Sequence, residues 1–144
     1  MRDHCSKEQQ HNRPNKSDTD QKKFFKAVEV SDIVKFSHEK VSDLSFVDQY
    51  ADKLFIRTMG ADGLEFKLSG QEWMKVASVP NDNVVDWEGA GDWITSQFIA
   101  CLCEREILSV SQMTVDAVRE CLEMASETAS RSVSYIGSKG MIRV

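Results

Sequence analysis

The sequence predicts an α/β domain, in which helices pack on a β-sheet. Stretches of strand length that are rich in Val, Ile, Leu and Phe recur between residues 30 and 79. Apolar residues then repeat at helical spacing over residues 91–105 and again after Thr114. A glycine-bearing loop, Gly89-Ala90-Gly91, separates these two regions. With 144 residues, the chain has the length of one domain with one core.

The composition is that of an acidic globular protein. Its net charge of −5 argues against nucleic-acid and anionic-membrane partners, which favour a basic surface. No apolar run approaches the roughly 18 residues of a transmembrane helix, and the first residues lack the apolar core of a secretory signal. We therefore expect a cytoplasmic protein. The four cysteines lack zinc-ribbon spacing, and Cys101 and Cys103 lie in an apolar helical pattern that predicts buried free thiols.

The N-terminal residues 1–23 are polar, which predicts a flexible segment ahead of a folded portion that covers residues 24–144. A short helix is expected to begin near Asp18. Its apolar face would consist of Phe24, Phe25, Ala27 and Val28.

The first two strands are expected at residues 30–36 and 54–58, because both stretches are rich in β-branched and aromatic residues. Between them, Ser37 is a candidate cap for a short helical turn, and a helix that ends near Asp52 is expected after it. The apolar positions of that helix would be Leu44, Phe46, Val47 and Tyr50.

A hairpin follows. Gly60 and Gly63 bracket its turn, and residues 64–68 alternate strictly between apolar and charged, which predicts a half-exposed strand. A further strand is expected over residues 73–79, where Pro80 ends it.

The glycine loop has the pattern strand, tight turn, helix. Val84 and Val85 would end a strand, and the helix would run from about Gly91 to Arg105. Amides at the start of a helix have no partner within it and carry the positive end of the helix dipole, so an anion is favoured there. A carboxylate beside a bound anion, here Asp92, is placed to abstract a proton from an attacking hydroxyl. A glycine turn into a helix with an acidic first turn explains the same residues without a ligand.

The last long helix is predicted to begin after Thr114 as its N-cap. One side of it carries the residues Val115, Val118, Leu122, Ala125 and Ala129. The small residues at 125 and 129 permit either close packing in the core or room for a flat ligand.

The longer context of the loop matches a known family. Asp86-Trp87-Glu88-Gly89-Ala90-Gly91-Asp92 and the apolar helix after it resemble the second signature of ribokinase-like (PfkB) sugar kinases, written D-T-x-G-A-G-D. Upstream, Thr58-Met59-Gly60-Ala61-Asp62-Gly63 resembles that family's T-x-G-x-x-G turn between two strands. The segment from Ser31 to Ser37 resembles the strand that leads to its N-x-x-E region. Three motifs in this order are more specific than any one of them.

The resemblance implies a partial ribokinase-like three-layer fold, comprising the C-terminal half of the sheet, its flanking helices and a strand hairpin. It implies transfer of the ATP γ-phosphoryl group to a sugar hydroxyl, with ATP and Mg²⁺ as cofactors. Asp92 would be the general base, and the amides of Gly89, Ala90, Gly91 and Asp92 would form the anion hole. The nucleotide would lie near Thr58, Gly60, Gly63, Ala125, Ser126 and Ala129.

The sequence departs from the family pattern in several places. Trp87 and Glu88 replace the small hydroxyl residues of the second signature. In the N-x-x-E region, Ser37 stands at the Asn position and Lys40 at the Glu position, so Glu39 is the candidate metal ligand. Family members are roughly twice as long, and the resemblance covers only their C-terminal half.

Two hypotheses follow for the chain as a whole. In the first, it is the ATP-side segment of a sugar kinase that pairs with a missing N-terminal half or with a second copy of itself, and it is incomplete for catalysis alone. In the second, it is a non-catalytic nucleotide-binding or interaction module that kept the fold and lost the chemistry.

Overall fold

The computed structural model describes residues 16–143, which belong to two compact units that divide between Ser31 and Asp32. The described part of the first unit is helix α1 (Lys16–Val30), followed by Ser31, whose hydroxyl donates to the carbonyl of Ala27 at 2.7 Å. The helix predicted near Asp18 is therefore confirmed. The predicted flexible segment 1–23 is too long, since its part from Lys16 onward is helical, and residues 1–15 lie outside the described residues.

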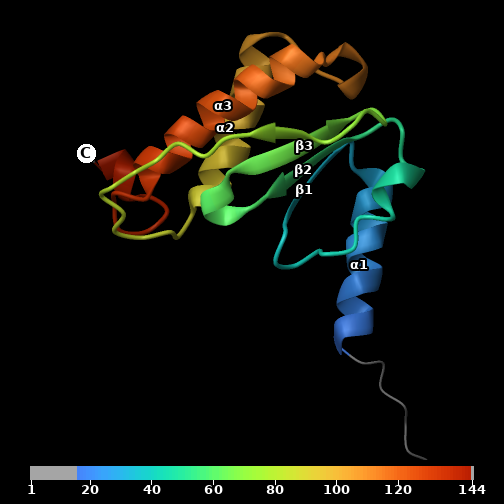
Figure 1. Ribbon diagram of the computed structural model, residues 1–144, viewed down its shortest axis with the longest axis horizontal. Coiled ribbons are helices and arrows are strands. Elements are labelled where there is room, and N and C mark those ends of the chain that lie inside the picture. The colour runs from blue at the N-terminus through green and yellow to red at the C-terminus, as the bar shows by residue number, and fades with distance from the viewer. Residues whose placement is uncertain (1–15, 144) are drawn as a thin grey trace, which may run out of the picture. The chain divides into compact units, whose positions relative to one another are not determined.

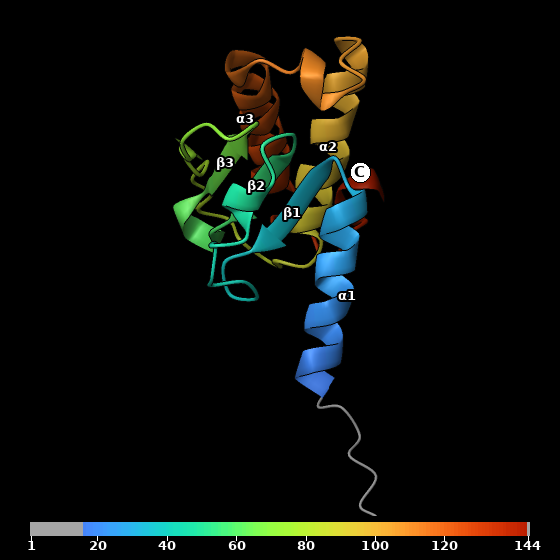
Figure 2. The same ribbon diagram turned by 90° about the vertical axis from the view of Figure 1, so that its right-hand side faces the viewer.

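The second unit contains a four-stranded sheet with two helices packed on it (Figures 1 and 2). The strands are β1 (Ile33–Ser37), β2 (Leu54–Thr58), β3 (Leu64–Leu68) and β4 (Met74–Val76), in the spatial order β1-β2-β3-β4. β1 runs parallel to β2, and the other two pairings are antiparallel. The helices are α2 (Ala90–Glu104) and α3 (Val115–Ser132). No helix among residues 16–143 is both long and apolar enough to cross a membrane.

The core lies between the sheet and the pair α2 and α3. Because side chains alternate along a strand, β2 and β3 contribute every second residue to this face. The buried cluster comprises Leu54, Ile56, Leu64, Phe66, Leu68, Val76, Phe98, Cys101, Leu102, Val118, Cys121, Leu122 and Ala125. The predicted N-cap is confirmed, since the Thr114 hydroxyl accepts a hydrogen bond from the amide of Ala117. Ala125 is fully buried in this core, so close packing explains that small residue.

The prediction that residues 64–68 form a half-exposed strand is right about the strand and wrong about its exposure. All five residues of β3 are buried. The two charged residues of β3 are paired: Glu65 with Arg57 and Lys67 with Asp48, each at 2.9 Å. The alternation in β3 therefore separates apolar side chains from paired charges, and both sets are buried.

The segment between β1 and β2 covers part of the second face of the sheet, opposite the one that packs on α2 and α3, and the helix predicted there is wrong. The short turn predicted after Ser37 does form, since the Ser37 hydroxyl accepts a hydrogen bond from the Glu39 amide at 3.2 Å and its carbonyl accepts one from the Val41 amide at 3.1 Å. In place of the predicted helix there is a short 3₁₀ turn, Val47–Gln49.

The ring of Phe46 lies 6.1 Å from that of Phe36 and 5.9 Å from that of Phe55. Phe46 and Val47 are adjacent and both buried, and the loop buries them together by lying flat on the sheet.

Two predicted strands are shorter than expected or missing. The strand expected over 73–79 narrows to β4 (Met74–Val76). The strand expected at Val84 and Val85 does not form. The amides of Val85 and Asp86 instead both donate to the carbonyl of Val133, just after the end of α3, at 2.7 and 3.0 Å. These bonds satisfy the backbone groups that a neighbouring strand would otherwise pair.

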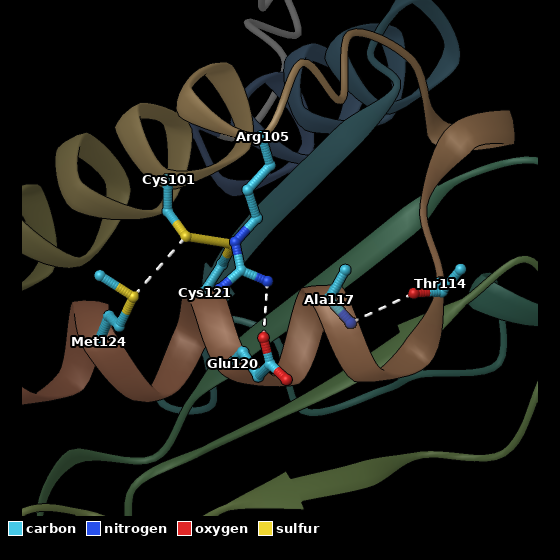
Figure 3. The surroundings of a disulfide bond; sticks show 7 residues. All are labelled: Cys101, Arg105, Thr114, Ala117, Glu120, Cys121 and Met124. Carbon is cyan, nitrogen blue, oxygen red and sulfur yellow. Dashed lines mark hydrogen bonds and ion pairs between the residues drawn. A yellow bond between two sulfur atoms is a disulfide. The ribbon is translucent and has the colours of Figure 1, made fainter.

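The helices α2 and α3 are joined by a disulfide between Cys101 and Cys121, whose Cα atoms are 5.6 Å apart (Figure 3). The prediction of free thiols is therefore wrong for Cys101, and Cys103 is free but exposed rather than buried. Cys101 and Cys121 both face the contact between the two helices, which brings them together. One turn away, Arg105 and Glu120 form an ion pair at 2.6 Å across the same contact.

Candidate functional site

A cavity of about 480 Å³ lies beside the C-terminal ends of β1 and β2. Its walls come from the residues after β1, the turn between β2 and β3, the segment before α2, the start of α2 and the second half of α3. Eight of the predicted site residues line it: Glu39, Thr58, Gly60, Gly63, Ala90, Gly91, Ser126 and Ala129. Residues from three separate sequence motifs thus share one cavity.

The hairpin turn forms one wall of this cavity. Gly63 has a φ of +91°, and a Cβ at this position would lie 2.7 Å from the backbone nitrogen of Ser78. Only glycine fits such a turn. The backbone closes it with a hydrogen bond from the Met59 amide to the Gly63 carbonyl at 2.8 Å. Thr58 precedes the turn, and its carbonyl accepts a bond from the His38 amide at 3.0 Å. His38 also lines the cavity and was not predicted as a site residue.

The start of α2 forms a second wall. Gly89 is the N-cap, with a φ of +80°, and a Cβ there would lie 2.7 Å from Cα of Ser138. Its carbonyl accepts bonds from the amides of Asp92 and Trp93, both at 3.0 Å. The Ala90 amide donates to the carbonyl of Trp87 at 3.3 Å. Within the part of the chain that the structure describes, the amides of Gly89 and Gly91 have no hydrogen-bond partner.

The predicted four-amide anion hole therefore needs a correction. The amides of Ala90 and Asp92 are already bonded within the first turn, because the chain enters α2 through a tight turn rather than from a strand. Two donors, from Gly89 and Gly91, are left for an anion. Both lie at the positive end of the dipole of a 15-residue helix.

Asp86 and the C-terminal segment hold this loop in place. One carboxylate oxygen of Asp86 accepts a bond from the Glu88 amide at 3.0 Å, and the other accepts one from the Gly137 amide at 2.9 Å. These two bonds, the Glu88 bond first, lower the pKa of Asp86 below its ordinary value. The indole of Trp93 donates to the carbonyl of Ser138 at 2.9 Å, which ties the same segment to α2.

Lys35 on β1 is a charged residue beside the start of α2, although it does not line the cavity. Its Nζ lies 3.4 Å from the position that a Cβ on Gly91 would occupy. Although part of Lys35 is exposed, burial of its ammonium group lowers the pKa below that of an ordinary lysine, and the charge of Asp92 partly offsets this effect. The sequence signal that could have drawn attention to Lys35 is its charge at the centre of the otherwise largely apolar strand β1.

Asp92, the predicted base, lies in the first turn of α2 and is exposed. It does not line the cavity, and neither does Gly89. Its carboxylate makes no hydrogen bond among the described residues, so the oxygens are accessible to a proton donor.

The residues predicted on the last helix divide into two groups. Ser126 and Ala129 line the cavity, whereas Ala125 faces the core with no exposed surface. The expectation that Ala125 contacts a nucleotide is therefore wrong for geometric reasons. The neighbouring residue Ser126 presents its side chain to the cavity from the next position on the helix.

Comparison with known proteins identifies the family. A sequence model described as pfkB family carbohydrate kinase matches residues 10–143. The chain belongs to this family. A search of curated proteins found no match.

Solved structures with the same fold are about twice as long as this chain. Aminoimidazole riboside kinase from Salmonella enterica, complexed with aminoimidazole riboside and an ATP analog, aligns with a TM-score of 0.69 and 19% identity, over 86% of this chain and 43% of that one. Ribokinase from Giardia lamblia aligns with a TM-score of 0.65 and 20% identity, over 80% of this chain and 41% of that one. A nucleoside kinase from Methanocaldococcus jannaschii, an archaeal member of the ribokinase family, aligns with a TM-score of 0.66 and 16% identity. The alignment covers 86% of this chain and 41% of that one. The chain thus spans less than half the length of these structures.

Most positions at which this chain departs from the pfkB signatures are exposed, while Ser37, at the expected Asn, is half-buried and lines the cavity. Trp87 is 64% exposed and lines the cavity, and Glu88 beside it is exposed. Lys40, at the position of the expected glutamate, is exposed as well. Glu39 lines the cavity, but no cluster of three or more His, Cys, Asp or Glu side chains suited to a metal occurs among residues 16–143.

Proposed function

We propose that this chain is the ATP-side segment of a pfkB-type sugar kinase, which transfers the γ-phosphoryl group of ATP to a sugar hydroxyl. The observation that carries the proposal is the shared cavity. Thr58 and the hairpin turn, Ala90 and Gly91 of α2, and Ser126 of α3 are far apart in sequence, and they converge at one end of the sheet. Ligands bind beside the C-terminal ends of parallel strands in α/β folds, and this cavity has that position.

Each wall of the cavity has a distinct task in this proposal. The hairpin turn and α3 offer a concave, mostly apolar surface for the base and ribose, with Thr58, Gly60, Gly63, Ser126 and Ala129 in contact. The Gly89 and Gly91 amides hold phosphate oxygens at the start of α2. Asp92 takes the proton of the attacking hydroxyl. Positioning and charge neutralisation are the main requirements of phosphoryl transfer.

A magnesium ion fits this site only with help from the ligand. Glu39 is the one carboxylate in the cavity lining. Mg²⁺ in kinase sites is commonly held by one or two carboxylates together with substrate phosphates and water. Glu39 would therefore provide one ligand, and the bound ion would neutralise charge on the transferring phosphoryl group.

The acceptor side of the reaction requires more chain than is present here. Family structures are more than twice as long as the portion that aligns with them. In the proposal, a sugar is oriented by a second half-domain, and the partner is that half or another copy of this chain. Proximity and orientation contribute several orders of magnitude to such reactions, so this chain alone is expected to bind nucleotide without turning over a sugar.

Nucleotide binding provides the test, measured by calorimetry on the full chain. Gly91→Val is expected to weaken ATP binding at least about tenfold, because it adds a branched side chain beside Lys35 at a position that lines the cavity. Ala100→Val, on an exposed position of the same helix, makes a comparable change away from the cavity and is expected to bind like the wild type. Circular dichroism checks that both variants fold. Absence of measurable ATP binding by the wild type would contradict the proposal.

A non-catalytic nucleotide-binding module is the second candidate. It is favoured by the exposed ring of Trp87 in the cavity lining, while the carboxylate of Asp92 lies outside that lining. An ATP-consumption assay with an added companion half-domain and a panel of sugars distinguishes the kinase from the non-catalytic module. ATP consumption that requires a sugar and is lost in Asp92→Asn supports the kinase, whereas tight ATP binding without transfer supports the module.

A further inference from the structure

We propose that the indole ring of Trp87 stacks against the base of the bound nucleotide. The inference deepens the proposed function and rests on it, since it takes the ligand of the cavity to be a nucleotide. The pfkB signature has a small hydroxyl residue at this position, so the family pattern gives the ring no role. The position of the ring, the anchoring of its backbone and the chemistry of its surroundings support the contact.

Trp87 differs from the other two tryptophans in its surroundings. It is 64% exposed, and it lines the cavity. Trp73 and Trp93 are half-buried, and the indole of Trp93 donates to the carbonyl of Ser138 at 2.9 Å. The indole of Trp87 makes no hydrogen bond among residues 16–143. A large apolar ring that is left exposed within a concave site is typical of a ligand-binding surface rather than of a core.

The backbone on both sides of Trp87 is held, so a fixed segment presents the ring. Before it, the amide of Asp86 donates to the carbonyl of Val133 at 3.0 Å. After it, the amide of Glu88 donates to the carboxylate of Asp86 at 3.0 Å. The carbonyl of Trp87 itself accepts a bond from the Ala90 amide at 3.3 Å. A side chain on an ordered backbone loses less conformational freedom when a ligand binds, and such preorganisation raises affinity.

The wall of the cavity to which Trp87 belongs suits a flat, uncharged group. The same segment before α2 also contributes Val79, Pro80 and Val84 to the lining, and Val79 and Val84 are 39% and 38% exposed. Among the described residues, no lysine or arginine lines the cavity, so this wall offers no cation for a phosphate. The base is the planar and uncharged part of a nucleotide, and bases stack on aromatic side chains through their π-faces. The base is therefore the part of the ligand that fits beside Trp87.

Calorimetry on the full chain tests the contact with three probes: ATP, adenosine and inorganic tripolyphosphate. Trp87→Ala is expected to weaken ATP and adenosine by a similar factor, about tenfold, as alanine substitution of a stacking side chain does. Tripolyphosphate has no base and should bind to the variant and the wild type alike. Trp87→Phe keeps an aromatic face and should retain most of the affinity. Leu108→Ala, at a 79% exposed position outside the cavity lining, is the control and should bind like the wild type.

Tryptophan fluorescence identifies the ring that the ligand contacts. Adenosine at saturation should quench the emission of the wild type, and the quenching should disappear in Trp87→Phe although calorimetry still detects binding. Trp73→Phe removes an indole that does not line the cavity, so this variant should keep the quenching. Because the Trp87 ring is exposed, Trp87→Ala should leave the Tm of the ligand-free chain unchanged.

Each result supports or overturns the inference. If the wild type and Trp87→Ala bind ATP equally well, the ring makes no contact with the base, while the proposed function stands. An equal loss of tripolyphosphate and ATP, or a lowered Tm, would assign Trp87 a structural role and overturn the inference. Loss of association with a companion half-domain, with nucleotide binding unchanged, would place the ring in a protein interface and overturn it as well.

The same titrations separate this inference from the proposed function. If adenosine binds in a Trp87-dependent way but ATP does not bind, the stacking contact stands and the proposed function fails. If neither adenosine nor ATP binds, both are wrong.

Discussion

Gly63→Ala is expected to lower the free energy of unfolding by about 3 kcal/mol, through backbone strain and overpacking together. The φ of +91° at Gly63 disfavours any residue with a Cβ. The added carbon would also lie 2.7 Å from the nitrogen of Ser78 and 3.0 Å from the carbonyl carbon of Ala77, both rigid backbone atoms. Chemical denaturation monitored by tryptophan fluorescence measures the change.

Gly60 provides a matched control in the same turn. Its φ is also positive, at +58°, but a Cβ there would meet no atom within 4 Å. Gly60→Ala should therefore cost only the intrinsic penalty of a left-handed residue, about 1 kcal/mol. Equal losses in the two variants would show that the contact of Gly63 with the segment after β4 does not shape the turn, and that this wall of the cavity is placed differently.

Reduction of the Cys101–Cys121 disulfide is expected to lower the free energy of unfolding by about 3 kcal/mol, the usual effect of removing a cross-link that closes a loop of this size. The two cysteines are 20 residues apart, and the bond joins the helices that cover the sheet. The loss should appear as a lower denaturation midpoint in the presence of a dithiol reductant. Because α2 and α3 both line the cavity, reduction of the disulfide should also weaken nucleotide binding.

Cys103→Ser is the control for this measurement. Cys103 is exposed and unpaired, so the variant should show the same midpoint as the wild type without reductant and the same fall with it. A non-reducing peptide map should contain a cross-linked pair of peptides with Cys101 and Cys121. Recovery of both peptides as free thiols, with no response to reductant, would restore the sequence-based interpretation of unpaired cysteines.

The strands and helices were predictable from sequence wherever a local pattern determined them. Residues 54–58 and 64–68 form strands, because β-branched and aromatic residues fit a pleated surface and glycines mark the turn between them. Thr114 stands at the N-cap of α3, as its hydroxyl and the apolar periodicity after it predict. These signals lie within a few residues of the element that they specify.

The errors in the fold concern features that depend on distant partners. The segment around Phe46 has apolar residues that suit a helix, but the second face of the sheet takes them up as a flat loop. Val85 has strand propensity, but the carbonyl of Val133, 48 positions later in the chain, captures its amide. The pairing of Cys101 with Cys121 depends on how α2 and α3 cross, which the spacing of the cysteines does not encode.

In the candidate site, too, features set by local sequence were predictable, and features that depend on distant contacts were not. The motifs that contain Thr58, Gly60 and Gly91 were recognisable from the spacing of their glycines, and these three residues line one cavity. The burial of Ala125 was predictable from the sequence, because the helical pattern places Ala125 on the same side of α3 as the buried residue Leu122. The approach of Lys35 to Gly91 was not predictable from the sequence, because only the packing of β1 beneath α2 brings its ammonium there.

The claim on which the account depends is that phosphate oxygens bind at the start of α2. A titration of the ¹⁵N-labelled full chain with ATP, followed by amide NMR, tests it directly. We expect the largest shift changes at the amides of Gly89 and Gly91, with smaller ones at Thr58 and Ser126, and adenosine should reproduce only the smaller set. Saturating ATP that leaves Gly89 and Gly91 unshifted, or that shifts residues remote from the cavity instead, would contradict the account.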